Sequence, residues 1–139
     1  MKLKNKLTLG LLFLFALILF FGGLAIFYIN RLSSDEEKIL KNNQETLLYS
    51  NNMLNALEDI PNKFVTITVF EQNLEKQEHN ITEPGEGDAT QTVRNHFDIL
   101  KKNAADSAQY PVIRRALFKI NELNEQAIIR KKWSCPKHG

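Results

Sequence analysis

A single cysteine, Cys135, is present in the chain, so no disulfide can form within it. Stability must therefore come from a packed core or from a partner chain. Glycine and proline are also scarce, with 6 and 4 residues in a chain of 139, and this composition is typical of helices rather than of a sheet protein. A basic stripe is missing too: the formal net charge is +2 and is spread along the chain, which argues against a nucleic acid partner.

Catalytic motifs are missing as well. No pairing of nucleophile and base, metal constellation or phosphate-binding loop can be assembled, so we predict no enzymatic activity, no catalytic residue and no cofactor. Cys135 and His138 resemble half of a metal site, but zinc needs three or four ligands, and we expect an exposed tail instead. His79 and His96 lie in polar helical sequence and are expected on the solvated surface.

The longest apolar run extends from Leu7 to Ile29 and contains no charged residue. As a helix it would be about 34 Å long, enough to cross a hydrocarbon core of about 30 Å with some tilt. It is too long for the apolar core of a usual secretory signal, and no small-residue cleavage site follows it. We therefore predict an uncleaved transmembrane helix over residues 7–30, with a cleaved signal as the alternative.

Charges flank this run unequally. Lys2, Lys4 and Lys6 lie before it, whereas Arg31 and then three acidic residues follow it. Because the positive flank of a membrane span stays in the cytoplasm, we expect the N-terminus inside and residues 31 onward outside, in the periplasm or extracellular space.

Polar sequence with helical spacing fills the chain up to about residue 132. Four helices are expected, over residues 31–60, 62–81, 89–108 and 111–132, and the first continues directly from the membrane helix. A loop over residues 82–88 contains proline and glycine and no apolar residue. The remaining segments are a basic cytoplasmic flank, 1–6, and an irregular tail, 133–139.

Each expected helix has an apolar face at helical spacing. In residues 31–60 this face is thin: Leu40, Leu47 and Leu54 repeat at seven and Leu57 adds to them, but Asn43, Gln44, Ser50 and Asn51 fill positions where a strong coiled coil would carry leucine. The other faces expected to be buried are Phe64, Ile67, Phe70 and Leu74; then Val93, Phe97, Leu100, Ala104 and Ala108; and finally Ile113, Leu117, Ile120, Leu123, Ala127 and Ile128. Phe118 is expected in the core as well.

Pro61 and Pro111 leave two arrangements open. If both mark turns, four helices form an up-down bundle within one chain. If both mark kinks, two long helices form a hairpin, and dimerisation completes the four-helix bundle. The fold is all-α in either case, and we favour the single-chain bundle.

This layout resembles the N-terminal sensor region of bacterial membrane receptors: a positively flanked anchor, a helix that continues out of it, proline-punctuated polar helices, and a basic run from Arg130 to Lys132. The chain is most similar to the four-helix-bundle input module of Bacteroidetes-type two-component sensor histidine kinases, over nearly all of residues 1–132. The resemblance implies signal transduction at the bacterial inner (cytoplasmic) membrane, with the sensor domain in the periplasm. It also implies a homodimer formed by helix packing, and a small anionic ligand or a periplasmic protein as the stimulus.

In that family the fourth helix enters a second membrane span, followed by a HAMP linker, a dimerisation helix with the phosphorylated histidine, and an ATP-binding domain. This sequence contains no second apolar run, and its histidines lie in no sequence that resembles the phosphoacceptor box, so we expect it to sense or dimerise but not to phosphorylate. The tail from Trp133 holds the only tryptophan and the only cysteine. Our hypothesis is that a one-base slip in the codons of Lys131 and Lys132 truncated a longer receptor and put residues 133–139 out of frame.

Arg114 and Arg115 are the candidate ligand-binding residues. In receptor bundles of this kind, arginines on the long helices hold anionic ligands, because a guanidinium group pairs with two oxygens of a carboxylate or anion. The alternative for this pair is a solvated charged face. For the whole chain, the alternative is a small bitopic scaffold or assembly protein that acts only through helix pairing.

Overall fold

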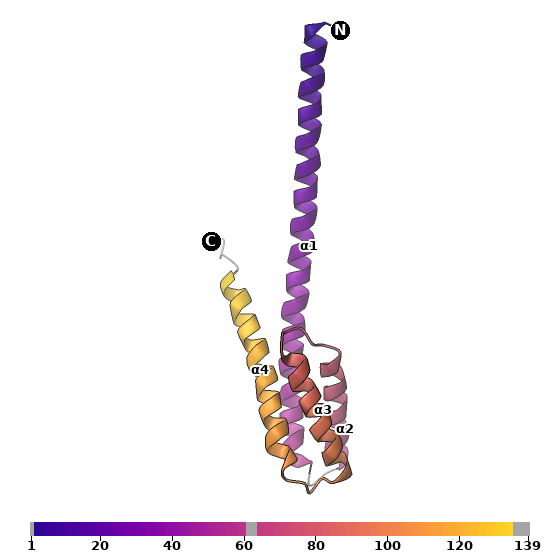
Figure 1. The fold of residues 1–139 in the computed structure, drawn as a ribbon, viewed down its shortest axis with the longest axis vertical. Helices are drawn as coiled ribbons and strands as arrows, with labels where there is room; N and C mark the ends of the chain where they lie inside the picture. The colour runs from indigo at the N-terminus through magenta and orange to yellow at the C-terminus, as the bar shows by residue number, and fades with distance from the viewer. Residues whose placement is uncertain (1, 61–63, 135–139) are drawn as a thin grey trace. The chain divides into compact units, whose positions relative to one another are not determined.

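The structure is a computed structural model that describes residues 2–60 and 64–134. Within these ranges it is all-helical and has no strand. The four helices are α1 (Leu3–Asp59), α2 (Phe64–Glu78), α3 (Glu86–Lys102) and α4 (Gln109–Ser134) (Figure 1). The predicted all-α fold class is therefore confirmed.

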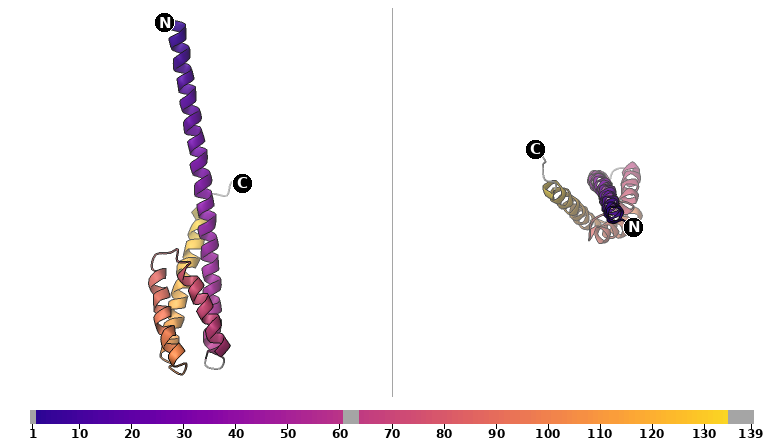
Figure 2. Two further views of the ribbon diagram at one scale, coloured as in Figure 1. Left: turned by 90° about the vertical axis from the view of Figure 1, so that its right-hand side faces the viewer. Right: turned by 90° about the horizontal axis from the view of Figure 1, so that it is seen from above.

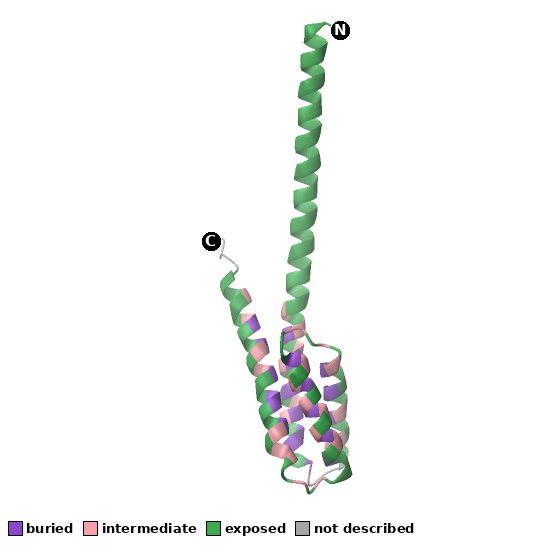
Figure 3. Cartoon of the chain, viewed as in Figure 1, coloured by how far each residue is buried: buried purple, intermediate pink, exposed green. Residues whose placement is uncertain are grey.

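The chain divides into two compact units, Met1–Lys38 and Ile39–Gly139, and α1 belongs to both. In the first unit the side chains of α1 are exposed, from Lys2 onward (Figure 3). The most apolar window of α1 has a mean hydropathy of 2.7, and α1 is the one described helix that is long and apolar enough to cross a membrane. An N-terminal signal sequence meets the same criterion.

The second unit is a four-helix bundle made by the last part of α1 together with α2, α3 and α4. These helices lie side by side, and each runs opposite to the one before it (Figures 1 and 2). Within the core, the rings of Phe70 and Phe97 stack with their centroids 4.3 Å apart. The buried apolar residues are Met53, Ala56, Leu57, Ile60, Phe70, Leu74, Val93, Phe97, Leu100, Ile113, Ala116, Leu117, Ile120 and Ala127.

The buried face of α1 differs from the predicted one. Asn43 and Ser50, which interrupt the leucine repeat, are fully buried, and Leu57 is buried as predicted. The leucines that repeat at seven lie at the edge of this face, and all are half-buried: Leu40, Leu47 and Leu54. The core of the bundle is therefore polar along part of α1.

The connection between α2 and α3 comprises residues 79–85, earlier than the predicted loop 82–88. Gly85 precedes α3 with a φ of 86°, in the left-handed region that glycine adopts without strain. Glu86 then begins α3, and its carboxylate accepts hydrogen bonds from two backbone N–H groups of the connection. These contacts start the helix before Asp88, where the composition alone indicated a loop.

The third helix ends at Lys102, not near residue 108 as predicted. Asn103 is extended, and the side-chain oxygens of Asn103 and Asp106 each accept the backbone N–H two residues later, at 3.2 Å. Such bonds compete with helical hydrogen bonds. The resulting turn leaves Ala104 half-buried and packed against the core, whereas Ala108 is exposed, so the prediction of a buried Ala108 is wrong.

The fourth helix begins at Gln109, so Pro111 lies in its first turn, where a missing N–H costs no helical hydrogen bond. Pro111 therefore follows a turn and does not kink a longer helix. Pro61 lies outside the described residues. The helix continues to Ser134, past the predicted end at residue 132, and the rest of the predicted tail, 135–139, also lies outside the described residues.

One aromatic residue expected in the core lies outside it. Phe118 is 57% exposed, whereas the preceding Leu117 is fully buried. Successive residues point about 100° apart around a helix, and the position after Ala116 and Leu117, which are both buried, lies beyond the edge of the buried face. Phe118 therefore contributes to the outer surface of α4.

Candidate functional site

Seven of the eight buried polar side chains of the bundle gather in one half of its core, which we call the polar half. On α1 they precede Met53, and on α4 Asn124 follows Ile120, so the buried apolar residues other than Ala127 occupy the other half. The eighth, Asn73, accepts a hydrogen bond from Asn52 of α1. Burying such groups costs free energy unless each finds a hydrogen-bond partner. The polar half consists of Asn43, Thr46, Ser50, Gln77, Glu86, Thr90 and Asn124.

Glu86 is fully buried at the centre of the polar half. Its Oε1 accepts hydrogen bonds from Gln77 Nε2 at 2.8 Å and Asn124 Nδ2 at 3.0 Å. Its Oε2 accepts the backbone N–H groups of Thr82 and Glu83, both at 2.9 Å. These four N–H donors match the four acceptor positions of a carboxylate group. Glu86 also lies in the first turn of α3, at the positive end of the helix dipole.

Three buried oxygens of the polar half have no hydrogen-bond partner within the described structure: Gln77 Oε1, Thr90 Oγ1 and Asn124 Oδ1. An unsatisfied buried acceptor costs about 1–3 kcal/mol. The polar half is therefore less favourably packed than the apolar half. It is built from amides, hydroxyls and one carboxylate, so its stability depends on directional hydrogen bonds between specific partners.

The connection 79–85 is tied to α1 by further hydrogen bonds. Asn80 Nδ2 donates to Thr46 Oγ1 at 3.1 Å, and Asn43 Nδ2 donates to Glu83 Oε1 at 3.1 Å. The polar residues that weaken the leucine repeat of α1 thus have a structural role. They hold the connection between α2 and α3 against the first helix.

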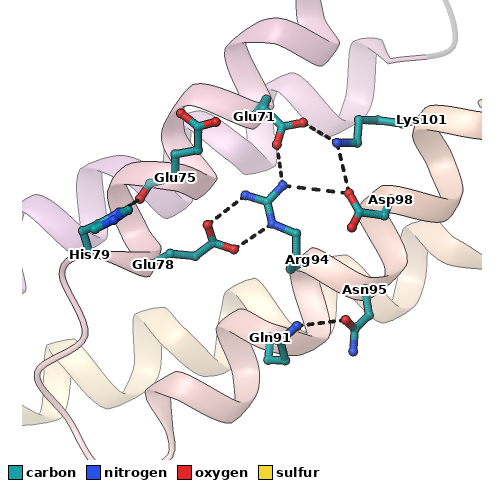
Figure 4. Close-up of polar contacts among 9 residues, drawn as sticks. All are labelled: Glu71, Glu75, Glu78, His79, Gln91, Arg94, Asn95, Asp98 and Lys101. Atoms are coloured by element: carbon teal, nitrogen blue, oxygen red, sulfur yellow. Dashed lines mark hydrogen bonds and ion pairs between the residues drawn. The ribbon is translucent and has the colours of Figure 1, made fainter.

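An ion-pair cluster joins α2 to α3 on the surface (Figure 4). Arg94 donates from Nε and Nη2 to the carboxylate of Glu78, at 2.7 and 2.8 Å, and from Nη1 to Glu71. Lys101 Nζ lies 2.7 Å from Glu71 Oε2 and 3.0 Å from Asp98 Oδ1. The cluster fixes α2 against α3, because the side chain of Arg94 is only 17% exposed and pairs with α2 through two carboxylates.

The cluster shifts the pKa values of its members. Burial raises the pKa of Glu71, but hydrogen bonds and charge from Lys101 and Arg94 lower it by a larger amount. The pKa of Glu71 therefore lies below its ordinary value of 4.5. The hydrogen bond to Glu71, which outweighs the effect of burial, raises the pKa of Lys101. Both shifts favour the charged forms that make the ion pairs.

Replacing Glu71 with glutamine is expected to reduce the acid sensitivity of the bundle. A carboxylate with a lowered folded-state pKa stabilises the fold fully above its ordinary value of 4.5, and this stability is lost as the pH falls through the lowered value. E71Q removes this step and costs about 0.5–1.5 kcal/mol at neutral pH. Urea unfolding of the full chain in detergent, at pH 7 and between about pH 5 and pH 3, measures both effects.

Glu75 supplies the control for this measurement. It is an exposed glutamate of the same helix, and its carboxylate forms no ion pair in the described structure (Figure 4). E75Q is expected to keep the acid sensitivity of the unmodified chain. Equal loss of acid sensitivity in both variants would contradict a specific contribution from Glu71.

The two candidate ligand-binding arginines lie on the outside of α4. Arg114 is half exposed, and its Nη2 is 3.7 Å from Glu58 Oε1 of α1. Arg115 is exposed, and it forms no hydrogen bond or ion pair within the part of the chain that the structure describes. The two guanidinium groups share no ion-pair partner within the described structure. Their role in ligand binding stays a prediction.

His79 and His96, the two histidines among the described residues, have different partners. His79 is exposed as predicted, with Nδ1 2.7 Å from the backbone oxygen of Glu75. His96 is half-buried, with Nδ1 next to Gln109 Oε1. No group of three or more histidine, cysteine, aspartate or glutamate side chains that could hold a metal occurs among the described residues. Cys135 and His138 lie outside those residues.

Sequence reasoning did not identify the polar half. Glu86 fell in the predicted loop, and Asn124 followed an apolar pattern without drawing notice. The available signal was the placement of Asn43 and Ser50 at positions where a packed helix usually carries leucine. Polar residues in such positions often make specific buried hydrogen bonds.

Comparisons with known proteins give no match: no protein-family model, no curated protein and no solved structure is significantly similar to the chain.

Proposed function

We propose that this chain is the membrane-anchored, extracytoplasmic sensory input region of a two-component sensor histidine kinase. The observation that carries the proposal is the continuity of α1, which runs without a break from an apolar segment of membrane-spanning length into a four-helix bundle. A helix of this kind connects a sensor domain mechanically to a membrane. In this proposal residues 31–132 supply the sensory input.

The membrane orientation in this proposal follows from the charges. Lys2, Lys4 and Lys6 hold the N-terminus in the cytoplasm, and the bundle lies in the periplasm of a bacterium, attached to the inner (cytoplasmic) membrane by a single span. The alternative of a cleaved signal would release the bundle from the membrane. The two cases differ in whether the mature protein still contains residues 7–30.

Partner binding in this proposal uses the outer surfaces of α1 and α4. Leu48 on α1 and Phe118 and Ile129 on α4 are 57%, 57% and 54% exposed, and such side chains are suited to pairing with a second copy of the bundle. Arg114 and Arg115 border the same surface of α4 and supply positive charge for a small anionic ligand. A periplasmic protein is the other class of stimulus.

Signalling would operate by helix displacement. A ligand that binds one arrangement of α1 and α4 more tightly than another shifts the population between them. Displacements of about 1–2 Å between helices are typical of such transitions. In an intact receptor, α4 would transmit this shift across the membrane to a dimeric kinase.

The test is to read the genomic DNA for about a kilobase past the codon of Gly139, in all three forward frames. The proposal predicts a second apolar span, then a dimerisation helix with a phosphoacceptor histidine and an ATP-binding domain, all in a frame one base away. A frame that closes on unrelated sequence would contradict it and favour a bitopic scaffold. The exposed Leu48, Phe118 and Ile129 fit a scaffold that acts by helix pairing equally well.

A further inference from the structure

One carboxylate contacts both α1 and α4. Glu83, in the connection 79–85, is only 11% exposed, and its Oε1 accepts a hydrogen bond from Asn43 Nδ2 of α1 at 3.1 Å. Its Oε2 accepts a hydrogen bond from Arg130 Nη2 of α4 at 3.1 Å. A residue that belongs to neither helix thereby links the two. Figure 1 shows the connection at the end of the bundle where α2 meets α3.

Near Glu83, few other interactions hold α1 against α4. Asn121 of α4 forms direct hydrogen bonds with Ser50 and Asn51 of α1, and Glu58 and Arg114 form an ion pair. Between Ile39 and Tyr49, no hydrogen bond or ion pair of the described chain joins α1 directly to α4. The core in this stretch is polar, so hydrophobic burial also adds less than at the other end.

Glu86 positions the backbone of Glu83 through a hydrogen bond. Its carboxylate holds the backbone N–H of Glu83 at 2.9 Å and the side chain of Asn124 of α4 at 3.0 Å. The backbone of Glu83 is thus fixed to α3 and, through Glu86, to α4. Because its backbone is held in place, the side chain of Glu83 can contact both Asn43 and Arg130.

From these contacts we infer that Glu83 is a releasable latch between α1 and α4, which sets their separation at the polar end of the bundle. The latch is weak, because Arg130 is 69% exposed and exposed ion pairs contribute little to the stability of a fold. A weak link is suited to a switch, since a ligand of modest differential affinity can open it. The signalling meaning of the latch rests on the proposed function, whereas its existence does not.

The experiment measures two distances by pulsed electron paramagnetic resonance, in the full chain with Cys135→Ser, reconstituted in lipid nanodiscs. One spin-label pair, Gln44→Cys with Lys132→Cys, reports on the polar end of α1 and α4. A reference pair, Asn55→Cys with Arg115→Cys, reports on the apolar end, and all four positions are exposed. Each pair is measured alone and combined with E83A, R130Q or the control E122A, which removes an exposed glutamate whose ion pair stays within α4.

The latch predicts that E83A and R130Q increase the long-distance population of the polar-end pair about two- to fivefold, while the reference pair stays unchanged. E122A is expected to leave both pairs unchanged. Three results would each overturn the inference: an unchanged polar-end pair in E83A, an effect of E83A that R130Q does not share, or equal broadening of both pairs. Because these distances do not depend on a kinase, the genomic reading and this measurement can fail independently.

Discussion

Replacing Phe97 with alanine is expected to destabilise the bundle by about 3–5 kcal/mol. Phe97 is fully buried, and its ring stacks on Phe70 at 4.3 Å between centroids, so truncation removes both buried apolar surface and an aromatic contact. Small domains are stable by only about 5–15 kcal/mol, so F97A is expected to lose much of its stability. Urea unfolding of the full chain in detergent, followed by circular dichroism, measures the loss.

Phe118 provides a matched control for F97A. The chemical change is the same, but the ring of Phe118 is 57% exposed on α4. F118A is expected to change the stability of an isolated bundle by no more than about 0.5 kcal/mol. If F118A destabilises the protein as much as F97A does at low concentration, the assignment of the core is wrong.

Replacing Glu86 with leucine is expected to cost about 3–4 kcal/mol, although leucine is the more apolar residue. Asn124 Nδ2 keeps its hydrogen bond to the backbone oxygen of Ile120, but Gln77 Nε2 loses its acceptor. The backbone N–H groups of Thr82 and Glu83 lose their acceptor as well. Urea unfolding measures the loss, and hydrogen exchange at these two amides is expected to become faster. E125L, at an exposed position of α4, is the control and should have little effect.

Glutamine at the same position separates hydrogen bonding from charge. In E86Q the new carbonyl oxygen can keep the two backbone donors. After the amides of Gln77 and Asn124 rotate by about 180°, the new amide nitrogen can donate to their side-chain oxygens, which lack partners in the unmodified chain. This rotation gives up the hydrogen bond from Asn124 Nδ2 to the backbone oxygen of Ile120. E86Q is therefore expected to cost only about 1 kcal/mol. A cost as large as that of E86L would mean that the negative charge itself is required.

The apolar half of the bundle was predictable because its pattern is local. Phe70, Leu74, Val93, Phe97 and Leu100 recur at helical spacing, and the structure buries each of them as expected. The prediction that Phe118 lies in the core was wrong, because it rested on the apolar character of the residue and ignored its position around α4. The end of α3 was misplaced because Asn103 and Asp106 act through side-chain bonds to the backbone, which hydrophobic periodicity does not register.

The polar half was not predictable in the same way. A glutamate or an asparagine is normally assigned to the surface, and its burial depends on partners that are distant in the sequence. Glu86 meets Asn124, and Asn43 meets Glu83, only after the four helices have packed. Periodicity locates one face of one helix, whereas these contacts depend on four segments at once.

The buried amides and hydroxyls also determine how the helices align along their length. Leu40, Leu47 and Leu54 repeat at seven, so sliding α1 by two turns would place leucine against much the same surroundings. The same slide would separate Asn43 from Glu83, Thr46 from Asn80 and Ser50 from Asn121. The three α1 side chains, which are buried, would lose these partners. A core of leucine alone would hold the bundle more tightly but in several alignments. The polar core is less stable than such a leucine core but favours a single alignment of the helices.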